Sequence, residues 1–293
     1  MQTADRRGKF LKDETRYREW RSSRLRSYPR CIEQILLPVD GLLSVTAAQV
    51  SAIKKVCGRS NMAIYQCRDT SADRPAVLAF ASKFGLSRLD RHLCTNADGV
   101  SELSVASGGP KQAYVPYSNR SLSWHTDGYY NERDRQVNAV ILHCTAGAAD
   151  GGENAILDPE LAYILLRDED PRFISAFEHP QCMTIPANAD ARGEIRPAVS
   201  GPVFSRDAGG KIHMRFSARK KNIAWRDDPV TTAARAFLSD ILNDENGPVL
   251  HYRLRAGEGL LSNNVLHNRS AFSDGPGLHR HLYRARYFDR IEN

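Results

Sequence analysis

The stretch Ser123-Trp124-His125-Thr126-Asp127-Gly128-Tyr129-Tyr130 places an imidazole and a carboxylate two residues apart. In a β-strand, side chains at positions i and i+2 point to the same face, so a strand here would aim both groups at one point. An imidazole nitrogen and a carboxylate oxygen form two thirds of the facial site that binds non-haem iron. The stretch therefore predicts a metal site at His125 and Asp127, provided that a third ligand comes from elsewhere.

A distant histidine is the expected third ligand. The chain contains nine histidines: His92, His125, His143, His179, His213, His251, His267, His279 and His281. We favour His267 because it follows a short apolar run, near the start of a loop, where a barrel strand would present a side chain at its mouth. Spacing alone does not exclude the others, since only folding can bring a residue so far along the chain to Asp127.

The residues from 278 to 288 alternate in a way that places three arginines, Arg280, Arg284 and Arg286, on one strand face. Guanidinium groups are costly to bury without partners. They are accommodated if they meet a dianionic ligand, because guanidinium binds carboxylate bidentately. The alternatives are a solvated edge strand and internal ion pairs, and the sequence leaves them open.

The order of elements indicates a mainly β domain with helices at its start and in its middle. Periodicity and capping residues predict helices over 44–56 (ended by Gly58), 75–84, 159–167, 171–177 and 229–242. Apolar and alternating runs predict strands over 62–67, 136–144, 154–158, 211–216, 249–254, 259–263 and 280–288. Many short strands around a helical insertion are typical of a closed or sandwiched antiparallel barrel. With no repeat or linker visible, we expect one domain over 31–293.

The net charge of +7 is concentrated at one end. Residues 1–30 hold ten basic and four acidic residues, and the rest of the chain is nearly neutral. One interpretation is an arm for an anionic partner, either a membrane surface or nucleic acid. The interpretation that we favour is a solvated, partly helical extension with apolar side chains packed on the body. These side chains are Phe10, Tyr17, Trp20 and Leu25.

Composition places the chain among cytoplasmic proteins. No apolar run approaches the ~18 residues of a membrane span, and the first ten residues lack the apolar core of a secretory signal. The six cysteines form no C-x-x-C pair, which favours reduced thiols. The H-E-x-x-H motif of zinc proteases and the G-x-S-x-G motif of hydrolases are missing from the sequence. Whether the chain forms a homo-oligomer is left open.

Four motifs occur in an order that resembles one family. They are W-H-T-D at 124–127, G-G-E-N at 151–154, L-H-N-R-S-A-F at 266–272 and R-H-L-Y-R-A-R-Y at 280–287. Over about residues 60–290 the chain resembles the taurine/2,4-D dioxygenase (TauD/TfdA) family, which includes γ-butyrobetaine hydroxylase-like enzymes. The resemblance implies a double-stranded β-helix (jelly roll) with a helical insertion and an α-containing N-terminal lead-in.

The resemblance also implies roles for individual residues. It implies that His125, Asp127 and His267 bind Fe(II), with 2-oxoglutarate and O2 at the remaining positions. Arg284 resembles the arginine that pairs with the distal carboxylate of 2-oxoglutarate, and Arg280 resembles a second arginine near the oxoacid end. Asn154 falls where many members carry a threonine that helps to hold the cosubstrate.

The implied reaction is hydroxylation of an aliphatic C–H bond in a small, polar or anionic molecule, with release of succinate and CO2. The carboxylate of Asp127 favours hydroxylation over halogenation, because halogenating relatives lack this ligand. Residues of the insertion that could meet an anionic substrate are His213, Arg215, Arg219 and Lys220. The alternative function is binding of anionic lipid or nucleic acid through residues 1–30, with a non-catalytic metal-binding barrel.

Overall fold

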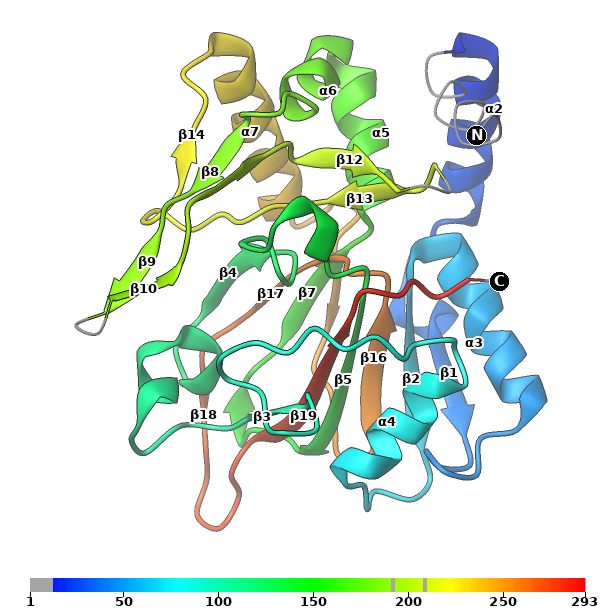
Figure 1. The fold of residues 1–293 in the computed structure, drawn as a ribbon. Helices are drawn as coiled ribbons and strands as arrows, with labels where there is room; N and C mark the ends of the chain where they lie inside the picture. Colours follow the sequence, from blue (N-terminus) through cyan, green and yellow to red (C-terminus); the bar gives the residue numbers. More distant parts are fainter. Residues whose placement is uncertain (1–12, 191–192, 208–209, 293) are drawn as a thin grey trace.

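Two β-sheets form the centre of the molecule (Figure 1). The computed structural model describes residues 13–190, 193–207 and 210–292. The larger sheet has the order β1-β2-β16-β5-β19-β3, with β1 (Leu36–Val39), β2 (Met62–Cys67), β3 (Ser101–Leu103), β5 (Ala139–Ala146), β16 (Glu258–Ser262) and β19 (His281–Tyr287). The smaller has the order β15-β7-β17-β4, with β4 (Leu122–His125), β7 (Asn154–Leu157), β15 (Leu250–Tyr252) and β17 (Leu266–Arg269).

The two sheets share one apolar core. Every pair of neighbouring strands in them is antiparallel except β1 and β2. Ile156 of β7 and Leu250 of β15 belong to the same buried cluster as Ile141 of β5 and Leu261 of β16. The expected jelly roll is confirmed. A further short pair, β6 (Asp150–Gly151) with β18 (Phe272–Ser273), lies beside the sheets.

Helices α3 (Ala47–Ser60) and α4 (Arg74–Ser82) form the lead-in that the sequence predicted. Thr46 begins α3 with a reciprocal capping box to Gln49, which satisfies two backbone donors at the helix start. The expected end at Gly58 is wrong. The helix continues to Ser60, and Asn61 ends it with a left-handed backbone (φ 56°), the conformation that terminates many helices.

The predicted insertion lies between β7 and β15 and packs against the smaller sheet. It contains α5 (Pro159–Glu169), α6 (Pro171–Phe177), α7 (Pro229–Asn243), β8 (Met183–Ile185), β9 (Asn188–Asp190), β10 (Gly193–Arg196), β11 (Val199–Gly201), β12 (Phe204–Arg206), β13 (Ile212–Met214) and β14 (Ala224–Trp225). Phe177 and Leu238 of its helices share a buried cluster with Trp124 of β4 and Leu266 of β17. The insertion therefore covers the two strands that carry His125 and His267.

The described part of the basic extension is helix α2 (Glu14–Ser27), which contacts the insertion. Its Tyr17 is buried, whereas Leu25 is exposed and Phe10 lies outside the described residues. Arg24 forms ion pairs with Asp158 (2.7 Å) and Glu160 (2.6 Å), both of them buried. No helix in the described ranges is long and apolar enough to cross a membrane. All six cysteines are free thiols.

Arg24→Ala should lower the free energy of unfolding by about 3 kcal/mol, because it leaves two buried carboxylates without their cation. Urea denaturation measures this loss. Arg26→Ala removes the same charge from an exposed position of α2 and should change stability by no more than about 0.5 kcal/mol. Equal effects of the two substitutions would show that the ion pairs of Arg24 do not hold α2.

Candidate metal centre

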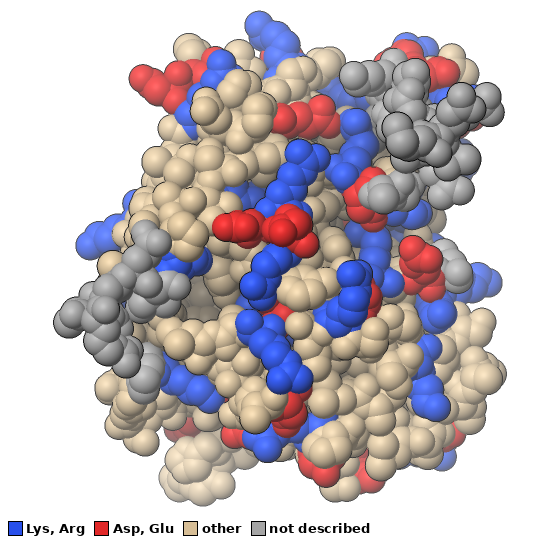
Figure 2. All heavy atoms as spheres, in the orientation of Figure 1, with Lys and Arg blue, Asp and Glu red and all other residues tan. Residues whose placement is uncertain are grey.

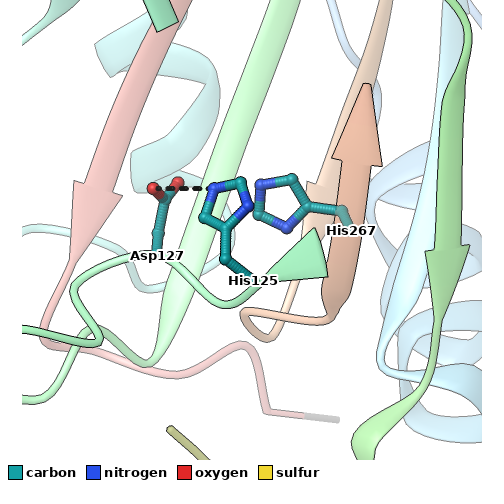
Figure 3. A group of neighbouring side chains, drawn as sticks. All are labelled: His125, Asp127 and His267. Atoms are coloured by element: carbon teal, nitrogen blue, oxygen red, sulfur yellow. Dashed lines mark ion pairs between the residues drawn. The ribbon is translucent and has the colours of Figure 1, made fainter. Parts of the chain in front are cut away.

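The three side chains expected to bind metal meet at one point (Figure 3). In the antiparallel pairing of β17 with β4, His267 lies opposite His125, and their ring centroids are 4.3 Å apart. Ligand atoms of His125, Asp127 and His267 all lie within 4.8 Å of one another, and all three residues are buried. Folding thus joins residues that the sequence separates by more than a hundred positions.

The geometry at Asp127 differs from the expected continuous strand. Strand β4 ends at His125, and Asp127 begins a turn. Gly128 follows with φ 69°, and a Cβ there would lie 2.5 Å from Cγ2 of Val137. The side chains of His125 and Asp127 therefore converge because of a tight glycine turn. The prediction that a β-strand presents both of them on one face is wrong in this detail.

Asn264, which was not among the predicted site residues, fixes this turn. Its Oδ1 accepts a hydrogen bond from the backbone N–H of Asp127 (2.8 Å). Its Nδ2 donates to the carbonyl oxygens of Asp127 (2.9 Å) and Val137 (2.6 Å). The backbone of Asn264 is itself left-handed (φ 51°). An asparagine three residues before a candidate histidine ligand was the available signal, since asparagine tolerates this conformation and offers both donor and acceptor.

Backbone carbonyls orient both imidazoles. Nδ1 of His125 lies 2.8 Å from the carbonyl oxygen of Ser123, and Nδ1 of His267 lies 2.9 Å from that of Val265. A carbonyl oxygen only accepts, so each Nδ1 carries the hydrogen and each Nε2 keeps its lone pair. Burial and the neighbouring His267 lower the pKa of His125 to about 3. The ring of His125 is therefore neutral, and in both rings Nδ1 is held by a carbonyl while Nε2 is the atom left for a metal.

One oxygen of the Asp127 carboxylate accepts a hydrogen bond from the described residues, and the other does not. Oδ1 accepts a hydrogen bond from Nη1 of Arg284 (3.1 Å) and lies 3.8 Å from Nη1 of Arg286. Oδ2 is buried and has no hydrogen-bond partner in the described part of the chain. Burial opposes ionisation, but the two guanidinium groups hold the pKa of Asp127 below its ordinary value. Two imidazole nitrogens and an ionised oxygen without a partner fit a divalent iron ion.

A small pocket beside the triad is lined by Leu142, Asn154, His267, Arg269, Arg280 and Arg284. Arg280 is 6 % exposed. It forms no ion pair with a carboxylate in the described part of the chain. Its guanidinium lies over the ring of Phe272 at 5.1 Å. Burial lowers the pKa of Arg280, and the negative charge of Asp274 offsets that shift only in part. An anionic ligand in the pocket would supply more negative charge.

Among the described residues, Asn154 keeps a free hydrogen-bonding atom at the pocket, whereas Arg215 of the insertion is bound by backbone carbonyls. Nδ2 of Asn154 donates to the carbonyl oxygen of Asn268 (2.9 Å), and its Oδ1 is buried without a partner in the described residues. Asn154 thus faces the pocket with spare hydrogen-bonding capacity. Arg215, by contrast, donates from its Nη atoms to the carbonyls of Met183 (2.8 Å) and Val199 (2.9 Å), and these bonds stabilise the insertion.

Comparison with known proteins agrees with this geometry. The family model described as "Taurine catabolism dioxygenase TauD, TfdA family" matches residues 64–286. The chain belongs to this family. A uridine-5'-phosphate dioxygenase from Amycolatopsis sp. is 28% identical over 173 residues, a match that spans 56% of this chain and 60% of that relative.

Solved structures similar to this TauD/TfdA-family chain share its fold. An asparagine oxygenase in complex with Fe(II), 3-hydroxyasparagine and succinate superimposes with a TM-score of 0.60 at 14% identity, over 84% of this chain and 81% of that one. A putative α-ketoglutarate-dependent taurine dioxygenase from Burkholderia xenovorans gives 0.57 at 15% identity, over 86% and 84%. The oxygenase OrfP with Fe and α-ketoglutaric acid gives 0.60 at 16% identity, over 84% and 81%.

Asn264→Gly should weaken Fe(II) binding by about 10- to 100-fold, because the turn that carries Asp127 loses its support. Glycine accepts the left-handed backbone, so the substitution adds no strain. Asn222→Gly is the matched control, since Asn222 also has a positive φ (61°) but is exposed. Anaerobic metal titration measures both affinities, and unchanged binding in Asn264→Gly would show that Asp127 does not depend on Asn264.

Proposed function

We propose that this chain is an Fe(II)- and 2-oxoglutarate-dependent dioxygenase that hydroxylates an aliphatic C–H bond of a small polar or anionic molecule, releasing succinate and CO2. The observation that carries the proposal is the buried convergence of His125, Asp127 and His267, with ligand atoms within 4.8 Å of one another. The buried guanidinium of Arg280, which forms no close ion pair in the described part of the chain and lines the pocket beside them, supports a carboxylate-bearing cosubstrate.

In this proposal the two Nε2 atoms and the Asp127 carboxylate would hold the iron. With 2-oxoglutarate and O2, iron in such a site supplies the oxidising power for attack on an unactivated C–H bond. The protein binds and orients the reactants. The carbonyls of Ser123 and Val265 keep the imidazoles directed at the metal, and the burial of all three ligands limits access of bulk water.

Arg284 of β19 and Arg280, which comes directly before that strand, are proposed to act at opposite ends of the cosubstrate. Nη1 of Arg284 is 3.1 Å from Asp127, so Arg284 belongs to the metal end. Arg280 lies four residues before it, directly ahead of β19, and four residues of extended chain span at most about 13 Å. We therefore propose that Arg280 pairs with the distal carboxylate and Arg284 acts near the oxoacid end. This order reverses the one that the family resemblance implied. Asn154 is proposed to assist through its free hydrogen-bonding capacity.

The relative from Amycolatopsis is named for a phosphorylated nucleoside. This supports an anionic substrate for our chain, in keeping with the basic side chains of the insertion. A cytoplasmic location and a homo-oligomeric state remain predictions.

The alternative function, binding of anionic lipid or nucleic acid through the basic extension, has little support. In the described part of that extension, Arg21 pairs with Asp168 (2.6 Å) and Arg24 pairs with Asp158 (2.7 Å). Arginines that are already neutralised by the body of the protein contribute little to an anionic surface.

Anaerobic addition of Fe(II) and 2-oxoglutarate should produce a weak visible charge-transfer band. His267→Ala should abolish the band, because one metal ligand is lost. His251→Ala is the control, since His251 is an exposed histidine of the same sheet and should leave the band unchanged. A well-folded wild-type protein without a band would refute the proposed function.

The order of the two arginines can be tested with 2-oxopentanoate, which replaces the distal carboxylate of 2-oxoglutarate by a methyl group. The wild type should bind 2-oxoglutarate about 10- to 100-fold more tightly, as expected for a charge-assisted hydrogen bond. Arg280→Ala should abolish this preference, and Arg284→Ala should retain it. If Arg284→Ala alone abolishes the preference, the assignments must be exchanged.

A further inference from the structure

Residues 216–218 of the insertion form an additional strand-like partner of the metal-bearing strand β4. The N–H of Thr126 donates to the carbonyl of Phe216 (3.0 Å), and the N–H of Ala218 donates to that of Trp124 (2.8 Å). Ser217 and His125 form the intervening antiparallel bridge. Residues opposite each other in an antiparallel pair direct their side chains to the same side. Ser217 therefore points to the side of the strand on which His125 faces the metal.

The hydroxyl of Ser217 has no evident structural use. Ser217 is 0 % exposed, and its Oγ has no hydrogen-bond partner within the described ranges. Buried polar groups are nearly always paired, because an unpaired hydroxyl carries a free-energy cost. A hydroxyl left in this state beside a metal ligand is the arrangement expected where a bound ligand completes the hydrogen bond.

Arg219 approaches the same site through Tyr129. Nη1 of Arg219 donates to the hydroxyl of Tyr129 (3.0 Å), and the ring of Tyr129 lies edge-on to that of His125, with centroids 6.3 Å apart. Because the Tyr129 oxygen accepts this bond, its own hydrogen can be donated to a ligand. Arg219 is thus two side-chain contacts away from a metal ligand.

Arg219 begins a run of three exposed basic residues, Arg219-Lys220-Lys221. None of the three forms an ion pair with a carboxylate in the described part of the chain. Other arginines of the insertion are paired, for example Arg206 with Glu178 at 2.8 Å. Figure 2 shows Lys and Arg side chains bordering a hollow on the face that is drawn.

We propose that Ser217, Tyr129 and Arg219 form a subsite for a phosphate group of the substrate, so that the enzyme acts on a small phosphate monoester. Two hydroxyl donors and a guanidinium fork suit the several acceptor oxygens of a tetrahedral anion. The following lysines suit its double negative charge. This inference rests on the proposed dioxygenase function, since it gives the substrate of that same site its chemical class.

The test measures binding without turnover. The anaerobic complex with Fe(II) and 2-oxoglutarate is titrated with a panel of sugar and nucleoside monophosphates, each compared with its dephosphorylated parent and with carboxylate analogues. At least one phosphate should bind 10-fold or more tightly than its parent. Arg219→Ala should remove that preference, whereas Arg26→Ala, which also deletes an exposed positive charge, should retain it.

Ser217→Ala gives a second, independent readout. It should weaken binding of the phosphate several-fold and leave binding of the parent alcohol unchanged. Because it deletes a buried hydroxyl without a partner, it should not lower the Tm. A lowered Tm would indicate a structural role instead and would count against the subsite.

The outcomes also separate this inference from the proposed function. The charge-transfer band before titration reports the metal and the oxoacid, so its absence would refute the dioxygenase itself. An intact band with no phosphate preference, a preference for carboxylates, or a preference that survives Arg219→Ala and Ser217→Ala would overturn only the phosphate subsite.

Discussion

The pairing of β4 with β17 is the constraint on which the site depends. It sets His267 opposite His125, and the tight turn after β4 then brings Asp127 to the same point. Since a one-residue slip in register would send one imidazole to the other face of the sheet, the site requires a strongly specified register. The apolar side chains of Trp124 and Leu266, which the insertion covers, provide that specification.

Several elements could be predicted because their signals are local. Helix α6 and strand β2 have the predicted bounds, since Pro171 and Asp170 mark the start of the helix and the run 62–67 is apolar. The candidate ligands His125 and Asp127 were recognisable as residue types at a familiar spacing. The glycine turn at 128 and the role of Asn264 were not, because they depend on contacts between segments far apart in the sequence.

The short strands of the insertion were also largely missed. Many are only two to four residues long, too short for an alternating pattern to appear. Likewise the sequence showed three arginines on one strand face, but it could not order them. The three arginines differ in the carboxylates that they contact. Arg286 pairs with Asp90 (2.5 Å) and Arg284 pairs with Asp127 (3.1 Å). Arg280 forms no ion pair with a described carboxylate. Only the folded structure assigns each cation its charge environment.

The bridge between Ser217 and His125 has a consequence for how selectivity can change. The candidate metal ligands His125 and His267 lie on the sheet, whereas residues 216–218, which pair with the same strand, belong to a loop of the insertion. Lengthening or reshaping that loop would move a bound molecule relative to the iron without displacing any metal ligand. The position at which a substrate is oxidised can therefore diverge among relatives while the chemistry is preserved.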